Sequence, residues 1–226
     1  MIMAKGTNNH TFGFDWPHGT KLTTTDQQPL ISTAADTEQP KISPHPSFIE
    51  KNGFISIEAE HATNNIPRSG AQWQIIPGLG RTSDSVAVYP VTIPSIDDPQ
   101  NLASQSPELD YDITTTSTGP LKAPTYCVPT RRINATRGLR YAIALDGQPP
   151  QIVDFNEPTE GPQWSKNVLR DAAMNTTSLT LSTPGKHQLK IWMVDPGVVL
   201  EKIVLDFGGA KDSYFGPPET LASVNP

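Results

Sequence analysis

The stretch that decides the fold runs from His187 to Gly209 and reads HQLKIWMVDPGVVLEKIVLDFGG. Two apolar runs flank Asp195–Gly197 (DPG), a sequence typical of a tight turn because proline fixes φ and glycine accepts positive φ. In the first run one face of an extended strand is apolar, at Leu189, Ile191 and Met193. The stretch therefore predicts two strands joined as a hairpin that closes a β-sandwich, with Asp206 near the end of the last strand.

The same alternation with a period of two recurs upstream. FISIEAE at 54–60, ELDYDIT at 108–114 and GLRYAIAL at 138–145 each place apolar residues at every second position, and Asp146-Gly147 marks a favoured turn. Helical periodicity is weak, and its best candidate is GPQWSKNVLRDAAMN at 161–175. Many short strands separated by turns indicate an all-β fold, a two-sheet antiparallel β-sandwich with jelly-roll-like character.

The alternation also sets the expected boundaries. Residues 1–48 are polar and without sustained periodicity, which predicts an irregular N-terminal tail or linker. The sandwich is expected over 49–220, and 221–226 is expected to be a short C-terminal tail. The first residues contain no apolar core of a signal peptide.

Composition excludes several classes of function. The 226 residues carry a net charge of −6, and a nucleic-acid-binding surface needs an excess of basic residues. No apolar run approaches the ~20 residues that cross a membrane. The single cysteine, Cys127, rules out an internal disulfide, and no nucleophile, metalloprotease or phosphate-loop motif is present. A binding or structural domain is therefore favoured over an enzyme.

Glu58 and Glu60 are the first candidate site residues. On a strand their side chains share one face about 7 Å apart, so they repel each other unless a cation lies nearby. A structural Ca²⁺ would take such carboxylates as ligands. If the first and last strands of the sandwich pair, Asp206 can join them. The alternatives are that these carboxylates are solvated or that they pair with Arg or Lys.

Aromatic and polar residues in expected loops are the second candidates. Exposed aromatic rings stack on the C–H faces of sugars, and an Arg can pair a uronic acid in a bidentate manner. Tyr89 also lies beside a predicted loop, whereas Trp192 lies within a strand and is expected to be core. The predicted carbohydrate-binding residues are Trp73, Tyr126, Arg131, Trp164 and Asn167, with Arg132 adjacent. The alternative for each aromatic is packing.

Four blocks of the sequence resemble one known family. They are ISIEAEH (55–61), WQIIPGLGRTSDSVAVYPVT (73–92), NATRGLRYAIALDGQPPQIVDF (134–155) and GKHQLKIWMVDPGVVLEKIVLDFGGAKDSYFGPPE (185–219). In order, and over about residues 50–220, they resemble the C-terminal domain of glycoside hydrolase family 115, the xylan α-1,2-glucuronidases. The resemblance implies an accessory β-sandwich placed after catalytic domains, so the catalytic residues lie outside this chain and the chain is not an enzyme by itself.

The layout is also similar to carbohydrate-binding modules of families 6 and 35. In those modules an EAE-like first strand and an Asp on the closing strand often hold a structural Ca²⁺, which implies Glu58, Glu60 and Asp206 as ligands here.

Together these features predict a non-catalytic module that binds polysaccharide containing uronic acid, or another acidic glycan. The alternative is a structural or dimerisation domain that supports an adjacent catalytic domain or a second copy without binding glycan. Neither nucleic acid nor membrane is an expected partner. We expect a secreted or periplasmic location in the native context, with a signal peptide removed upstream of this sequence; the alternative is a cytosolic protein.

Overall fold

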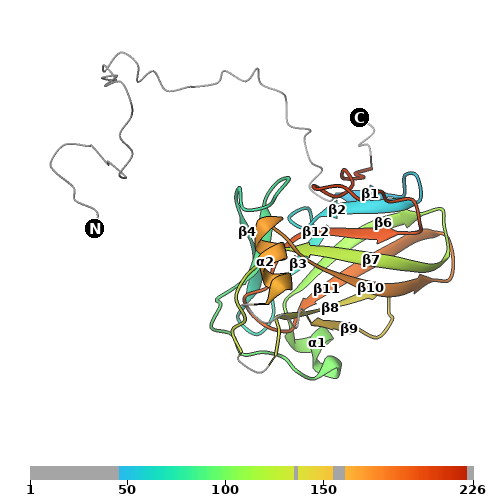
Figure 1. Ribbon diagram of the computed structural model, residues 1–226. Helices are drawn as coiled ribbons and strands as arrows, with labels where there is room; N and C mark the ends of the chain where they lie inside the picture. The colour runs from blue at the N-terminus through green and yellow to red at the C-terminus, as the bar shows by residue number, and fades with distance from the viewer. Residues whose placement is uncertain (1–45, 135–136, 155–160, 223–226) are drawn as a thin grey trace, which may run out of the picture. The chain divides into compact units, whose positions relative to one another are not determined.

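The computed structural model describes residues 46–134, 137–154 and 161–222, which form two six-stranded sheets packed face to face (Figure 1). Sheet A contains β1 (Ser47–Ile49), β3 (Asn64–Ile66), β6 (Glu108–Thr115), β8 (Arg140–Leu145), β9 (Gln151–Asp154) and β11 (Gly185–Met193). Sheet B contains β2 (Phe54–Glu58), β4 (Gln72–Ile76), β5 (Ser85–Tyr89), β7 (Gly119–Cys127), β10 (Ala173–Leu181) and β12 (Val199–Asp206). The predicted β-sandwich is confirmed.

Two short helices accompany the sheets: α1 (Pro99–Gln105) and α2 (Pro162–Leu169). The second lies in the segment with the best helical pattern, whereas α1 was not anticipated. Asp98 caps α1 by accepting a hydrogen bond from the backbone N–H of Gln100 at 2.9 Å. Neither helix, nor any other in the described residues, has the length and apolar character to cross a membrane.

The strand order is β1-β6-β11-β8-β9 in sheet A, with β3 also on β6, and β10-β7-β12-β5-β4 in sheet B, with β2 also on β12. Pairing among the described strands is antiparallel except for β1 on β6. The first strand of the sandwich thus begins at Ser47, inside the stretch expected to be tail. β12 is the hub of sheet B because it pairs with β7 on one side and with β5 and β2 in succession on the other.

The core lies between the sheets and uses the apolar faces that alternation predicted. Tyr111 is fully buried, and its hydroxyl donates to the Ala59 carbonyl at 2.7 Å, so the polar atom is satisfied inside an apolar layer. Trp192 is buried as expected, but with Leu102 of α1 in a smaller cluster separate from the central core. The inward positions include Ile55, Ile57, Leu109, Ile113, Tyr141, Ile143, Leu145, Leu189, Ile191, Met193, Ile203 and Leu205.

The expected closing hairpin is wrong. β11 pairs with β6 and β8 in sheet A, whereas β12 pairs with β7, β5 and β2 in sheet B, so the Asp195–Gly197 corner carries the chain from one sheet to the other. Gly197 has φ +96, which favours glycine at the corner as the turn signature suggested. A tight turn is compatible with both connections, and only the strand partners distinguish them.

Asp195 fixes this crossover. Its side chain is fully buried, and its carboxylate accepts from Arg140 Nε at 2.7 Å, Arg137 Nη2 at 3.1 Å and Ser95 Oγ. Burial alone would raise the pKa of Asp195, but the hydrogen bonds from Arg140 and Ser95 hold the pKa below its ordinary value. The carboxylate therefore stays ionised and ties the corner to β8 and to the loop before α1.

Residues 213–222, here called the C-terminal strap, cover the free edge of β2. Ser56 N donates to Thr220 Oγ1 at 3.1 Å, Thr220 N donates to the Ser56 carbonyl at 2.9 Å, and Ser56 Oγ donates to the Pro217 carbonyl at 2.9 Å. Ala222 N donates to the Ser47 carbonyl at 2.8 Å, which links the strap to β1. The strap protects an edge strand that would otherwise present unpaired backbone groups.

Glu201 is a buried carboxylate at an irregularity of β12, where the register with β7 shifts between Leu200 and Lys202. Its Oε2 lies 3.4 Å from Arg81 Nε. Burial raises the pKa of Glu201 to about 7, although the charge of Arg81 acts in the opposite direction. The folded state therefore binds a proton at Glu201 more strongly than the unfolded chain does.

The buried Asp195 pair predicts a large effect of one substitution. Asp195→Asn should lower the free energy of unfolding by about 3–5 kcal/mol, because Arg137 and Arg140 lose the charge of the buried carboxylate that they contact. Asp97→Asn is the matched control, since Asp97 contacts the same arginines but is 60% exposed, and its loss should be below about 1 kcal/mol. Urea denaturation measures both, and equal losses would contradict the role given to Asp195.

Glu201 predicts a pH dependence of stability. Because its pKa is raised from 4.5 to about 7 in the fold, its contribution to stability should fall as the pH rises from about 4.5 to about 7 and should change little above that. Thermal denaturation across this range should show a shallower decline for Glu201→Gln than for the unmodified chain. Parallel curves for the two proteins would show that Glu201 does not titrate in this way.

Candidate functional site

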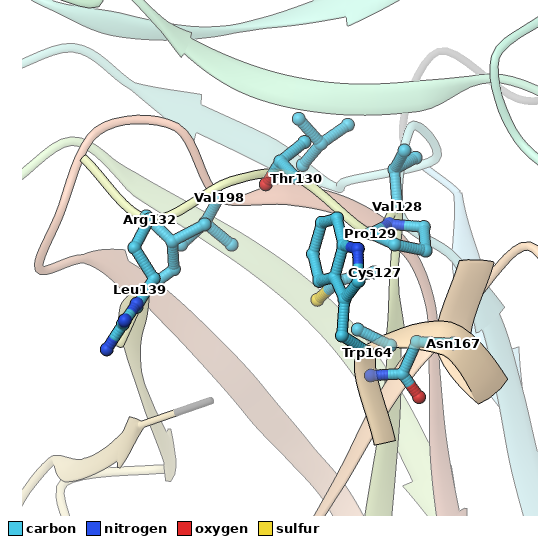
Figure 2. A pocket seen from close by; sticks show the side chains of 11 residues that line it. Cys127, Val128, Pro129, Thr130, Arg132, Leu139, Trp164, Asn167 and Val198 are labelled. Carbon is cyan, nitrogen blue, oxygen red and sulfur yellow. The ribbon is translucent and has the colours of Figure 1, made fainter. Parts of the chain in front are cut away.

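A pocket opens where the end of β7, the helix α2 and the start of β12 meet (Figure 2). Its apolar lining comes from the end of β7, from Leu139, and from Val198 and Val199 just after the crossover. Cys127 also lines it, and burial raises the pKa of this thiol well above its ordinary value, so the thiol stays protonated and weakly nucleophilic. The pocket offers contact area and no nucleophile.

Helix α2 presents Trp164 to the pocket. Pro162 occupies the first turn, where its missing N–H costs nothing, and Gly161 precedes it without a side-chain cap. Asn167, on the same helix, is 1% exposed, and its Oδ1 accepts from Gln163 Nε2 at 3.0 Å and from Arg170 Nη2 at 2.7 Å. These bonds anchor the end of the helix and leave Trp164 half-buried at the pocket wall.

Arg132 provides the charge at this site. In Figure 2 Trp164 and Asn167 lie on one side of the pocket, and Arg132 and Leu139 lie on the other. Arg132 is half-buried, and across the described ranges it makes no hydrogen bond or ion pair. Of the two adjacent arginines, Arg132 lines the pocket, whereas Arg131 is exposed and does not line it.

The size of the pocket limits what it can hold. Its interior of about 30 Å³ admits only a couple of water molecules. A larger group would therefore lie across the mouth, between Trp164 and Arg132, rather than inside. This arrangement suits contact with the surface of a polymer better than enclosure of a small ligand.

Two predicted aromatics do not join the pocket. Trp73 is 1% exposed in the core, and its Nε1 donates to the Pro107 carbonyl at 3.2 Å, so its ring is not available to a glycan. Its alternation with polar Gln72 and Gln74 in β4 is the signal that sequence reasoning missed. Tyr126 is buried, with the Arg81 guanidinium 5.1 Å from its ring centroid, and lines a separate groove on sheet B.

Tyr89 keeps an accessible ring outside the pocket. It is 39% exposed on β5 and lies in an open groove with Gln72 and Gln74. No charged residue lines that groove among the described residues. Tyr89 is therefore a useful reference for any experiment on Trp164.

The three predicted metal ligands are separated. β2 and β12 do pair, but the register sets Lys202 opposite Glu58 and Asp206 opposite Phe54, about 13 Å along the strand from Glu58. Asp206 Oδ1 accepts from the backbone N–H groups of Gly208 and Ala210 at 2.7 and 3.0 Å. It closes a turn after β12.

The other two carboxylates have protein partners. Glu58 Oε1 lies 3.0 Å from Lys202 Nζ and accepts from Thr82 Oγ1 at 2.8 Å. Glu60 lies just past the end of β2, and its Oε1 accepts from Asp84 N at 3.1 Å. Burial raises the pKa of Glu58, although Lys202 acts in the opposite direction. No group of three or more His, Cys, Asp or Glu side chains in the described part of the chain could hold a metal ion.

Comparison with known proteins places the fold. Among solved structures the chain is similar to a family GH115 4-O-methyl-α-glucuronidase, BtGH115A, with specificity for decorated arabinogalactans, at 21% identity and a TM-score of 0.53. The alignment covers 69% of this chain and 18% of that chain, so this chain corresponds to a small part of such an enzyme.

A second similar structure is the family 35 carbohydrate-binding module from Clostridium thermocellum, at 15% identity and a TM-score of 0.44, covering 67% of this chain and 97% of that one. At 21% identity, the likeness to the GH115 structure concerns the fold alone. No curated protein matches the chain.

The family match is more extensive. Residues 47–219 match the family described as Glycosyl hydrolase family 115 C-terminal domain, a span that takes in the sandwich from β1 through most of the C-terminal strap. The chain therefore belongs to the family of glycosyl hydrolase family 115 C-terminal domains.

Proposed function

We propose that this domain is a non-catalytic module that binds polysaccharide bearing glucuronic acid and serves an enzyme of family 115. The observation that carries the proposal is the half-buried Arg132, which has no partner in the described ranges and faces Trp164 across a shallow apolar pocket. An unpaired guanidinium beside an aromatic ring is suited to a sugar that carries a carboxylate.

The family membership supports the class of ligand. The similar enzyme BtGH115A is described as a glucuronidase specific for decorated arabinogalactans. For this chain we propose the same broad class, a neutral backbone with glucuronic acid branches such as glucuronoxylan or an arabinogalactan. Trp164 would contact a sugar ring, and Arg132 would pair the uronate carboxylate.

A second candidate function rests on a different surface. Val168 and Leu169 at the end of α2, with Tyr214 and Phe215 of the C-terminal strap, are large apolar side chains that are 50–84% exposed. Arg81 Nη1 donates to the carbonyls of both Arg170 and Tyr214, so the two segments are neighbours. This apolar patch suits a structural domain that packs on the catalytic part of its enzyme. Such a domain would bind no glycan.

Affinity electrophoresis separates the two candidates. The chain should be retarded in gels containing 4-O-methylglucuronoxylan and much less in gels containing the same polymer after its carboxyl groups are reduced to alcohols. Arg132→Gln should weaken binding to the acidic polymer by about 10- to 150-fold, because loss of a charge-assisted pair costs on the order of 1.5–3 kcal/mol. Trp164→Ala should weaken binding to both polymers.

Two variants serve as matched controls. Arg131→Gln removes the adjacent exposed cation, and Tyr89→Ala removes an exposed aromatic from the other groove, so both should bind nearly as the unmodified chain does. Absence of retardation on glucuronoxylan and on arabinogalactan would refute the glycan proposal in favour of the structural one. Retardation that survives Arg132→Gln and Trp164→Ala would refute the assigned site.

A further inference from the structure

A group of buried charges outside the pocket lies where β2 and β12 pair. Glu58 and Lys202 are direct cross-strand partners, and their side chains are 9% and 4% exposed. Lys202 Nζ is 3.0 Å from Glu58 Oε1. A buried carboxylate is strongly disfavoured without a counter-charge, and here the neighbouring strand supplies one.

The oxygen atoms around the Lys202 ammonium are of the kinds that also bind metal ions. Besides Glu58, its ammonium donates to the carbonyls of Phe215 at 3.0 Å and Pro217 at 3.3 Å. The three donors of the ammonium thus have three oxygen acceptors, one carboxylate and two carbonyls from the C-terminal strap. Carboxylate and backbone carbonyl oxygens are the donors that Ca²⁺ also prefers.

Arg81 is a second internal cation in the same region. Its side chain is 6% exposed, and its Nε lies 3.4 Å from Glu201 Oε2. The guanidinium lies over the rings of Tyr126 and Tyr214, at 5.1 and 5.2 Å from their centroids. The next residue, Thr82, donates to Glu58 Oε1 at 2.8 Å, so the loop that carries Arg81 also contributes to the Glu58 site.

A calcium ion of the predicted kind does not fit these residues. The register sets Asp206 opposite Phe54 and away from Glu58, and its Oδ1 accepts from two backbone N–H groups. An ion placed on Glu58 would meet the Lys202 ammonium inside a buried site. Like charges repel strongly where water cannot screen them. Glu58 Oε2 and Glu60 Oε2 are buried without hydrogen-bond partners in the described residues, and the cation in direct contact with the Glu58 carboxylate is Lys202.

We propose that Lys202, with Arg81, takes the place of a structural metal ion in this sandwich. The cation that joins β2, β12 and the C-terminal strap is then part of the chain, and the domain keeps its fold when divalent ions are removed. This inference does not depend on the glycan proposal, because it concerns a different region and is tested without a ligand.

The first measurement is the melting temperature of the full chain in millimolar CaCl₂ and in EGTA. The two values should agree. A calcium site filled at about a hundred times its Kd would raise the melting temperature by about 5–10 °C. A shift of that size in the unmodified chain would overturn the proposal.

The second measurement uses variants of the pair. Lys202→Met should unfold at much lower urea concentration than the unmodified chain, because it leaves the Glu58 carboxylate buried without its cation. Glu58→Gln/Lys202→Met removes both charges and should recover most of that loss, and it remains informative if the single variant does not fold. A double variant no more stable than Lys202→Met would show that the ion pair is not what Lys202 provides.

Discussion

The buried ion pair between Asp195 and Arg140 determines how this chain closes its sandwich. A carboxylate with no access to water must keep its positive partners, and Arg140 belongs to β8 of sheet A. The corner is therefore held against sheet A while the following residues enter sheet B as β12. Since β12 is the hub that pairs with β7, β5 and β2, the arrangement of sheet B follows from where this corner is fixed.

The sequence predicts the faces of the strands well and their partners poorly. Alternation placed Ile55, Tyr111 and Ile191 in the core, because burial of one face depends only on a local period of two. The connection at Asp195–Gly197 was missed, because the same turn can join strands of one sheet or of two. Partners and register are long-range properties that no local pattern contains.

The candidate sites show the same division. Trp164 and Asn167, which the sequence singled out as candidate carbohydrate-binding residues, both line the pocket. Which of Arg131 and Arg132 joins them depends on the path of an irregular loop with no periodicity. Glu58 was identified as a carboxylate that needs a cation, and the strand register supplies Lys202 instead of Asp206. That a cation should lie beside the Glu58 carboxylate could be inferred from the sequence. That the cation is the Lys202 side chain could not be inferred, because it depends on the strand register.

The chain uses its cations in two ways, and this contrast supports the assignment of the pocket. Lys202 and Arg140 are engaged with acceptors from the chain itself, so their charges serve the fold. Arg132 is half-buried at the pocket and has no acceptor in the described ranges, and it is the cation to which we assign the proposed ligand. Trp164 lies across the pocket from it, and the proposal of a sugar with a carboxylate as ligand rests on these two side chains.

The most direct test of this account is a nuclear magnetic resonance titration that follows the tryptophan indole N–H signals as a xylo-oligosaccharide substituted with glucuronic acid is added. Trp73 and Trp192 are buried, so their signals report on the fold, whereas Trp164 reports on the pocket. The Trp164 signal, assigned by Trp164→Phe, should shift in a saturable manner while those of Trp73 and Trp192 stay in place. A Trp164 signal that does not move at saturating oligosaccharide would contradict the account.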